Sequence, residues 1–312
     1  MVFLYRIFLF LLLAGALLAD VTLVIMMNWS AGVFWLLAAM ILPVWLGSFK
    51  QKYFAAALSA FFVSVLAFFV FITPEEQFKG VKWEASCSEI PEIIIDGDKA
   101  VISNLRDFKY RSEDDFDVRY INQEYDLNKL ESLDLILSHW DGMDNIAHTL
   151  FCFNFTDGQT AVLSVEMRCP EGTSRAYYTT FFKQHGLIYI WGTKEDLVDL
   201  RSRYRIVESL YRYRTTATAA EARQLFTLLA GRTNQLYSNW EFYRTIQGNC
   251  TTEILPYLKE VRRDLHWDLR ALINGSLDRM LFEQGFLAHR PGEEFESLRA
   301  RSFVPGRASG NE

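Results

Sequence analysis

The sequence predicts an α+β protein with three N-terminal transmembrane helices, followed by a domain in which an antiparallel sheet lies beside helices. Three observations predict this. Residues 1–73 are nearly uncharged, short runs rich in β-forming residues dominate 118–213, and helical apolar spacing follows residue 218. Runs of strands followed by runs of helices are typical of the α+β class.

The N-terminal region is predicted to be a three-helix transmembrane anchor over residues 1–73. Its only charged residues are Arg6, Asp20, Lys50 and Lys52. Three apolar runs, at roughly 7–27, 31–48 and 53–73, are each long enough to cross a hydrocarbon layer of ~30 Å. A cleaved signal peptide ending near Asp20 is the alternative. Against it, the first apolar run continues past that point and two more spans follow.

The positive charges set the expected orientation. Arg6 precedes the first span, Lys50 and Lys52 separate the second from the third, and the loop 28–30 carries no charge. Loops with Lys and Arg stay in the cytoplasm. We therefore expect a cytoplasmic N-terminus and a domain beyond residue 74 on the opposite side of the membrane.

Residues 74–305 are predicted to form one extracytoplasmic domain, and 306–312 a disordered tail. Residues 74–312 carry 29 Lys and Arg against 37 Asp and Glu, a net charge of −8. Nucleic acid is therefore not an expected partner, because phosphate binding requires a positive field. Nothing in the sequence indicates an oligomeric state.

The four cysteines are Cys87, Cys152, Cys169 and Cys250. Their spacing, alone or with histidine, indicates no metal site, and we expect no cofactor. A disulfide is allowed outside the cytoplasm, and Cys87 and Cys169 flank predicted loops, so these two could pair. Cys152 lies in a strand-like run and is predicted to be a core residue.

The first half of the domain is predicted to be β-structure. The strongest signal is a hairpin in which Thr156-Asp157-Gly158-Gln159 joins two runs of β-forming residues, because Asp-Gly is a strong turn signal. The predicted strands are Val118–Asn122, Leu133–Leu137, His148–Phe155, Thr160–Met167, Leu187–Trp191 and Val207–Tyr213.

The second half is predicted to be helical. Thr218 followed by Glu221 forms a capping box ahead of a helix over 222–237. Further helices are expected at 240–247, 250–264 and about 276–288. Gly285 is predicted to end the last of these, since glycine commonly follows a helix.

Cys250 is the first candidate for covalent chemistry. Gly248 ends the preceding segment, Asn249 is a good N-cap, and residues 253–261 have helical apolar spacing. A thiol in the first turn of a helix feels the positive end of the dipole, which favours the nucleophilic thiolate. The alternative is a buried structural cysteine beside an ordinary cap.

A thiol nucleophile needs a base, and His148 is the best placed of five histidines because it opens a strand. A strand-end histidine bonded only to backbone is the alternative. If the hairpin turn centres near Gly158, His148 lies across from residues 166–168, so Glu166 is predicted to orient the imidazole. A surface ion pair between Glu166 and Arg168 is the competing interpretation.

Four further residues are predicted to contact substrate or stabilise an oxyanion. Backbone N–H groups at the start of the Cys250 helix are the expected oxyanion donors, and Asn249 either adds a donor or only caps the helix. His139 and Asp141 compete with Glu166 as polar groups behind the base, and ordinary loop residues are the alternative for both. The four assigned residues are Asn249, Thr251, Ser164 and His139.

Several runs resemble motifs of the family of the Lnb N-terminal periplasmic domain. Their order and spacing carry the resemblance, which covers most of residues 80–285. The runs are Trp83-Glu84, Asn104-Leu-Arg106-Asp107-Phe108-Lys-Tyr110, Gln123-Glu124-Tyr125-Asp126-Leu127, Ala147-His148-Thr149, Ser164-Val-Glu166-Met-Arg168 and Asn249-Cys250-Thr251-Thr252.

The resemblance implies an apolipoprotein N-acyltransferase-like enzyme. Such an enzyme moves an acyl chain from a membrane phospholipid to the N-terminal amine of a diacylated lipoprotein. It also implies a multi-pass protein of the bacterial inner membrane whose C-terminal domain is periplasmic. Asn249-Cys250 is similar to the Asn-Cys motif of the lecithin:retinol acyltransferase group, which implies a permuted papain-like fold and a Cys thioester. Thr251-Thr252 stand where that group has acidic and His residues.

Two other interpretations stay open at this point. The same Cys-His pair would serve an extracytoplasmic cysteine hydrolase (a peptidase, amidase or phospholipase) in which water is the acceptor. In a non-enzymatic, membrane-anchored binding domain, Cys250 would be inert. The rate at which Cys250 is alkylated distinguishes an activated thiol from an inert one.

Overall fold

The computed structural model describes residues 73–140, 145–173, 179, 183–205, 207–244, 249–272 and 274–306. The chain divides after Lys79, and α4 (Pro74–Phe78) belongs to the first unit. Within the described ranges, no helix is long and apolar enough to cross a membrane. The three predicted transmembrane helices fall on residues 1–73 and lie outside the described residues, apart from Thr73. Residues 307–312 of the predicted tail also lie outside them.

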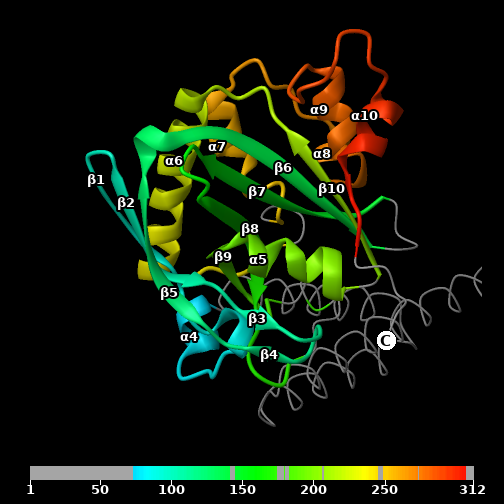
Figure 1. Cartoon of the computed structure of the whole chain (residues 1–312). Helices are drawn as coiled ribbons and strands as arrows, with labels where there is room; N and C mark the ends of the chain where they lie inside the picture. The colour runs from blue at the N-terminus through cyan, green and yellow to red at the C-terminus, as the bar shows by residue number, and fades with distance from the viewer. Residues whose placement is uncertain are drawn as a thin grey trace, which may run out of the picture. The chain divides into compact units, whose positions relative to one another are not determined.

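The second unit, Gly80–Glu312, is built on a nine-stranded sheet (Figure 1). The strand order is β1-β2-β9-β8-β7-β6-β10-β11, and β5 pairs with β2 outside this path. The strands are β1 (Glu92–Asp96), β2 (Lys99–Arg106), β5 (Tyr120–Asp126), β6 (Leu130–Trp140), β7 (Ala147–Phe155), β8 (Thr160–Arg168), β9 (Gly186–Gly192), β10 (Glu208–Arg214) and β11 (Phe303–Val304). A separate small ladder joins β3 (Lys109–Tyr110) to β4 (Phe116–Asp117).

The sheet is mixed, so the α+β class is confirmed, while the predicted antiparallel sheet needs correction at one parallel pair of strands. β2 and β9 run parallel and pair at Arg106 and Gly192, whereas the other paired strands of this sheet are antiparallel. The two parallel strands are far apart in the sequence, and no local turn fixes the direction in which they meet. A pattern of strand-forming runs therefore cannot predict that β2 and β9 pair in parallel.

Helices cover both faces of the sheet (Figure 1). α6 (Ala219–Ser238) packs on one face against β1, β6 and β9, and α5 (Lys194–Leu197) packs on the other against β8. Side chains of β7 alternate between the two layers: Phe151 and Phe153 belong to the core under α6, and Leu150 and Cys152 to the core under α5. The remaining helical segments are η1 (Ala85–Cys87), η2 (Leu127–Lys129), η4 (Leu200–Tyr204), α7 (Leu255–Val261), α8 (Leu269–Leu272), η5 (Asn274–Ser276), α9 (Leu277–Glu283) and α10 (Phe295–Ser302).

The hairpin and the capping box are confirmed. β7 and β8 pair from Asn154 and Thr160 onward, and Gly158 in the connecting turn has a φ of +87°, which a residue without Cβ adopts at little cost. Thr218 accepts a hydrogen bond from the N–H of Glu221, and the Glu221 carboxylate accepts one from the N–H of Thr218. These local contacts fix the ends of β7, β8 and α6.

Two helix predictions need correction. The segment predicted as a helix over 240–247 is extended at Phe242, which forms a β-bridge with Gly186. The helix predicted over 250–264 is shorter, because α7 runs only from Leu255 to Val261. Proline at the start of α7 favours a helix that begins there, since proline has no N–H to contribute to a preceding turn. The end predicted at Gly285 agrees with α9, which stops at Glu283.

The predicted cysteine pair is brought together. The Cys87 sulfur lies 3.3 Å from the backbone nitrogen of Cys169 and 3.7 Å from its carbonyl oxygen, and both side chains are buried. Whether the two form a disulfide stays a prediction. Cys152 is fully buried on β7, so its assignment to the core is confirmed.

Candidate active site

The predicted base and its predicted partner extend from strands that separate. The β7–β8 ladder ends at Leu150 and Ser164, although both strands continue beyond this pair. Beyond the Leu150–Ser164 pair, β7 remains hydrogen-bonded to β6, and β8 remains hydrogen-bonded to β9. His148 and Glu166 each lie two residues beyond the last pair, so their side chains extend from the same face. The register predicted from the turn, with His148 across from residues 166–168, is confirmed.

His148, Ser164 and Glu166 form one hydrogen-bonded group. Nε2 of His148 lies 2.7 Å from the Ser164 hydroxyl and 3.0 Å from Oε1 of Glu166, and the hydroxyl donates to that carboxylate at 2.6 Å. The single hydroxyl hydrogen is committed to Glu166, so Nε2 must carry the hydrogen that it shares with Ser164. This fixes the tautomer, and Nδ1 is the ring nitrogen left for a reacting group.

Arg201 holds the carboxylate from a third element. Its Nη2 donates to Oε1 of Glu166 at 2.8 Å and its Nη1 donates to the Leu197 carbonyl at 2.9 Å. The Arg201 side chain is only 4% exposed. The alternative ion pair between Glu166 and Arg168 is not what forms, because Arg168 donates to the backbone carbonyls of Cys87 and Ser88 instead.

A capped turn, rather than a helix, presents Cys250. The side-chain oxygen of Asn249 accepts hydrogen bonds from the N–H groups of Thr251 at 2.9 Å and Thr252 at 2.8 Å. The N–H of Glu253 donates to the Asn249 carbonyl at 3.0 Å, which closes a single helical turn. Asn249 is thus a cap, as expected, but α7 begins only at Leu255. The predicted helix dipole is therefore not what favours a thiolate at Cys250.

The Cys250 sulfur lies where β7 and β8 separate. It interacts with the His148 side chain and with the backbone N–H of Thr149. Its distance is 3.9 Å to the Ala147 carbonyl oxygen and 3.4 Å to the side-chain nitrogen of Asn274. Cys250 is 6% exposed. The structure therefore brings the predicted nucleophile to the predicted base, on a sulfur that is largely shielded from water.

The electrostatics of the pair favour a thiolate beside an imidazolium. Burial acts to lower the pKa of His148, but the Glu166 carboxylate and hydrogen bonding with Cys250 outweigh it and raise that pKa to about 9. Burial acts to raise the pKa of Cys250, and the charge of His148 together with its hydrogen bond lowers it overall. Burial likewise opposes ionisation of Glu166, yet His148 and Arg201 hold its pKa well below the ordinary value. The two protons titrate as a pair.

Replacing Glu166 by Gln removes the charge that most raises the pKa of His148. We expect less imidazolium at neutral pH, hence less thiolate, so that iodoacetamide alkylates Cys250 about tenfold more slowly at pH 7. The midpoint of the alkylation rate against pH should move to higher pH. Glu171→Gln, which removes an exposed partner of Lys82, is the matched control. An unchanged midpoint in Glu166→Gln would show that this carboxylate does not set the charge of His148.

Thr251 is part of the contacts that fix the turn. Its hydroxyl lies 2.9 Å from the Thr149 hydroxyl and accepts a hydrogen bond from Asn274 at 2.9 Å, and the residue is buried. These bonds join the Cys250 turn to β7 and to η5. Ser164 lies inside the His148–Glu166 contact. A role of Thr251 or Ser164 in contacting substrate stays a prediction.

His139 extends from the opposite face of the sheet to His148. It pairs across from Ala147 on β7, while its neighbour Ser138 pairs across from His148. The His139 ring is buried and lies edge-on to Tyr211, with 5.5 Å between ring centroids. Its predicted role in substrate binding stays a prediction, and Asp141 lies outside the described residues.

Sequence analysis missed two residues of this site, Arg201 and Asn274. A buried arginine within Asp-Leu-Arg-Ser-Arg looks like any exposed basic run, and its partner is 35 positions away. Asn274 precedes a glycine and lies just ahead of the helix predicted over about 276–288, so no predicted element or motif includes it. Its burial at 4% exposure is the signal that identifies it, and that signal exists only in the folded chain.

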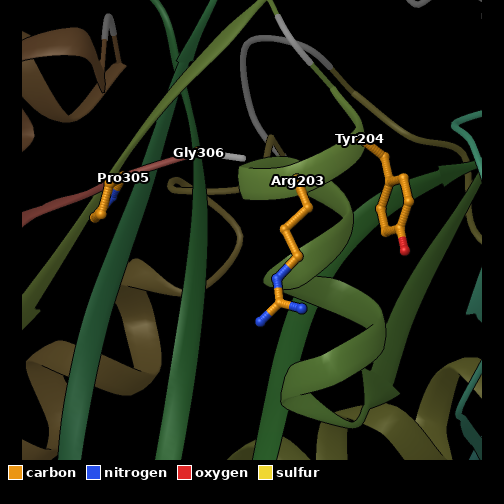
Figure 2. A pocket seen from close by; sticks show the side chains of 4 residues that line it. All are labelled: Arg203, Tyr204, Pro305 and Gly306. Atoms are coloured by element: carbon orange, nitrogen blue, oxygen red, sulfur yellow. The ribbon is translucent and has the colours of Figure 1, made fainter. Parts of the chain in front are cut away.

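A pocket of about 370 Å³ lies elsewhere, beside η4 and the end of β11 (Figure 2). It is lined by Arg203, Tyr204, Pro305 and Gly306, and none of the predicted site residues lines it. Arg203 is paired with Asp199 at 3.1 Å. In the part of the chain that the structure describes, no group of three His, Cys, Asp or Glu side chains could hold a metal ion.

Comparison with known proteins identifies a family that this chain matches. The model of the family described as the Lnb N-terminal periplasmic domain matches residues 116–275, just over half of the chain. The matched range includes Cys250, His148 and Glu166, as well as Arg201 and Asn274. No curated protein and no solved structure gives a match.

Proposed function

Since this chain belongs to the family of the Lnb N-terminal periplasmic domain, we propose that it is a thiol acyltransferase that acts at a membrane surface. In this proposal Cys250 takes an acyl chain from a phospholipid and passes it, through a thioester, to the N-terminal amine of a lipoprotein. The observation that carries the proposal is the buried Cys250–His148 pair, whose imidazole is oriented by Glu166. The permuted papain-like fold is proposed on the same Asn-Cys and His pattern.

The first half-reaction forms the thioester. The Cys250 thiolate attacks the ester carbonyl carbon of the phospholipid and the carbonyl oxygen becomes an oxyanion. When the intermediate collapses, the ester C–O bond breaks and the glycerol oxygen takes a proton from the His148 imidazolium. Lysophospholipid leaves, Cys250 carries the acyl chain and His148 is neutral. The fixed hydrogen on Nε2 supports Nδ1 as the nitrogen that gives this proton.

The second half-reaction transfers the chain. The neutral α-amine of the lipoprotein attacks the thioester carbonyl, and its surplus proton passes to Nδ1 of His148. The C–S bond then breaks, the amide forms, and Cys250 returns to the thiolate. Because His148 ends as the imidazolium, the ion pair with which the cycle began is restored. One site thus serves both substrates in turn.

Two features favour an amine over water as the acceptor. Cys250 is 6% exposed, so bulk water has little access to a thioester formed there. The predicted transmembrane helices over 1–73 would hold the domain at the bilayer that contains both proposed substrates, which raises their effective concentration. Wall-directed hydrolases need only a tether. The hydrolase and the non-enzymatic domain are the competing outcomes of the test below.

The test uses the full chain in vesicles of phospholipid with labelled acyl chains, together with a diacylated lipopeptide that has a free N-terminal amine. We expect lysophospholipid and N-acylated lipopeptide in equal amounts. The same lipopeptide with an acetylated amine is the matched control and should yield no acylated product. Free fatty acid with either peptide would indicate a phospholipase. Absence of any phospholipid cleavage would contradict the proposal.

A further inference from the structure

Asn274 lies at the centre of the contacts around Cys250. It opens η5 and is 4% exposed. Its side-chain oxygen accepts the backbone N–H of Ala147 at 2.9 Å. Its side-chain nitrogen lies 2.9 Å from the Thr251 hydroxyl, 3.4 Å from the Thr149 hydroxyl and 3.4 Å from the Cys250 sulfur. Asn274 therefore contacts both the strand that carries the base and the turn that carries the thiol.

The orientation of this amide is fixed by its partners. A backbone N–H can only donate, so the group that faces Ala147 must be the amide oxygen. The NH₂ group then faces Thr251 and Cys250. It has two hydrogens for three acceptors, and the shortest contact, to the Thr251 hydroxyl, takes one of them. The other is left for the sulfur and the Thr149 hydroxyl, both at 3.4 Å.

We propose that Asn274 is a further catalytic residue, whose side-chain N–H donates to the Cys250 sulfur and stabilises the thiolate for attack. The inference rests on the proposed function, since it assigns a role toward the reacting atom of that site. It differs from the role of Glu166, which acts on the sulfur only through His148. The Asn274 amide touches the sulfur itself.

The burial of Cys250 makes this hydrogen bond important for stabilising a thiolate. Burial makes an anion costly unless donors replace the water that it has lost. Among the residues that the structure describes, three donors surround the Cys250 sulfur: the His148 imidazolium, the N–H of Thr149 and the Asn274 amide. His148 must give up its proton during the first half-reaction, whereas the amide keeps its hydrogens throughout. The amide is therefore a permanent donor at the site of the charge.

The test measures the rate of Cys250 alkylation against pH in the full chain, without any acyl substrate. Asn274→Asp keeps an acceptor for Ala147 but replaces the donor by an oxygen, and Asn274→Leu keeps the branched shape without a donor or a charge. Both should alkylate about tenfold more slowly at pH 7, with a midpoint about one pH unit higher than that of the wild type.

The matched control is Asn154→Asp. Asn154 is a buried asparagine near the other end of β7, where it contacts Ser132 and Arg212, and its replacement should leave the alkylation profile of Cys250 unchanged. Circular dichroism establishes that each variant is folded, and either Asn274 variant suffices. An unshifted midpoint in a folded variant overturns the role of Asn274. A wild-type midpoint at the value of an ordinary thiol would instead count against the Cys250–His148 pair, so the two failures are distinguishable.

Discussion

Replacing Cys250 by Ala or Ser is expected to lower acyl transfer by at least about 10⁴-fold, because in the proposed mechanism each removes the group that forms the covalent intermediate. Alanine has no nucleophile. Serine retains a hydroxyl, but its oxygen stays protonated because an imidazolium has no free nitrogen to accept that proton, so it does not replace the thiolate. Lysophospholipid and acylated lipopeptide should both disappear, since both half-reactions depend on this sulfur.

Cys152→Ser is the matched control for this result. Cys152 is also a buried cysteine, but burial raises the pKa of its thiol to about 12, so it is not activated. The Cys152→Ser variant, provided that it is folded, should transfer acyl chains at the wild-type rate. Transfer retained in Cys250→Ala would exclude the thioester mechanism, whatever the behaviour of Cys152.

Replacing His148 by Gln is expected to have the second largest effect, a loss of about 10³-fold or more at pH 7. Two consequences add in the same direction. The reaction loses its proton donor and acceptor, and the Cys250 thiol loses the charge that opposes the effect of burial on its pKa. The alkylation midpoint of Cys250 should therefore rise above that of an ordinary thiol.

The pH dependence of the wild type follows from the same pair. As pH falls, Cys250 takes up a proton and the rate declines, and because its pKa is lowered this limb lies at lower pH than for an ordinary thiol. As pH rises through about 9, the His148 imidazolium loses its proton and the first half-reaction loses its acid. Transfer should be bell-shaped, and His148→Gln should lose the alkaline limb. His289→Gln, at an exposed histidine, should retain both limbs. A His148→Gln profile identical to that of the wild type would contradict the assignment.

The parts of this site that follow local rules were predictable from sequence. The Asp157-Gly158 turn sets the register of β7 and β8, and the register places Glu166 across from His148. The orienting carboxylate could therefore be named from a turn and a count of residues. Asn249 also acts locally, because its side chain caps N–H groups two and three positions later.

The parts that depend on distant segments were not predictable. Arg201 contacts Glu166 from a π-helix turn at η4, and Asn274 contacts Cys250 from η5. Residue spacing in the sequence predicts neither contact. The hairpin of β1 and β2 is absent from the predicted strands, although Asp96-Gly97 is a turn signal like that of the β7–β8 hairpin. The apolar spacing of residues 250–264 predicts too early a start for α7, because Pro256 marks where the helix begins.

The physical cause that favours a thiolate at Cys250 differs from the one that the sequence predicts. A helix dipole was expected to favour the thiolate, yet the sulfur lies on a turn five residues ahead of α7. The charge of His148, held up by Glu166 and by Arg201 behind it, supplies the stabilisation instead. The proposed activation of this thiol therefore rests on tertiary contacts, and the variants at Glu166 and Asn274 test those contacts one at a time.

The most direct measurement is the mass of the wild-type chain after incubation with phospholipid vesicles in the absence of any lipopeptide. The account predicts one added acyl group on the peptide that contains Cys250, released by neutral hydroxylamine and absent from Cys250→Ala. Lysophospholipid that accumulates while Cys250 stays unmodified, or an acyl group found on a different residue, would contradict it.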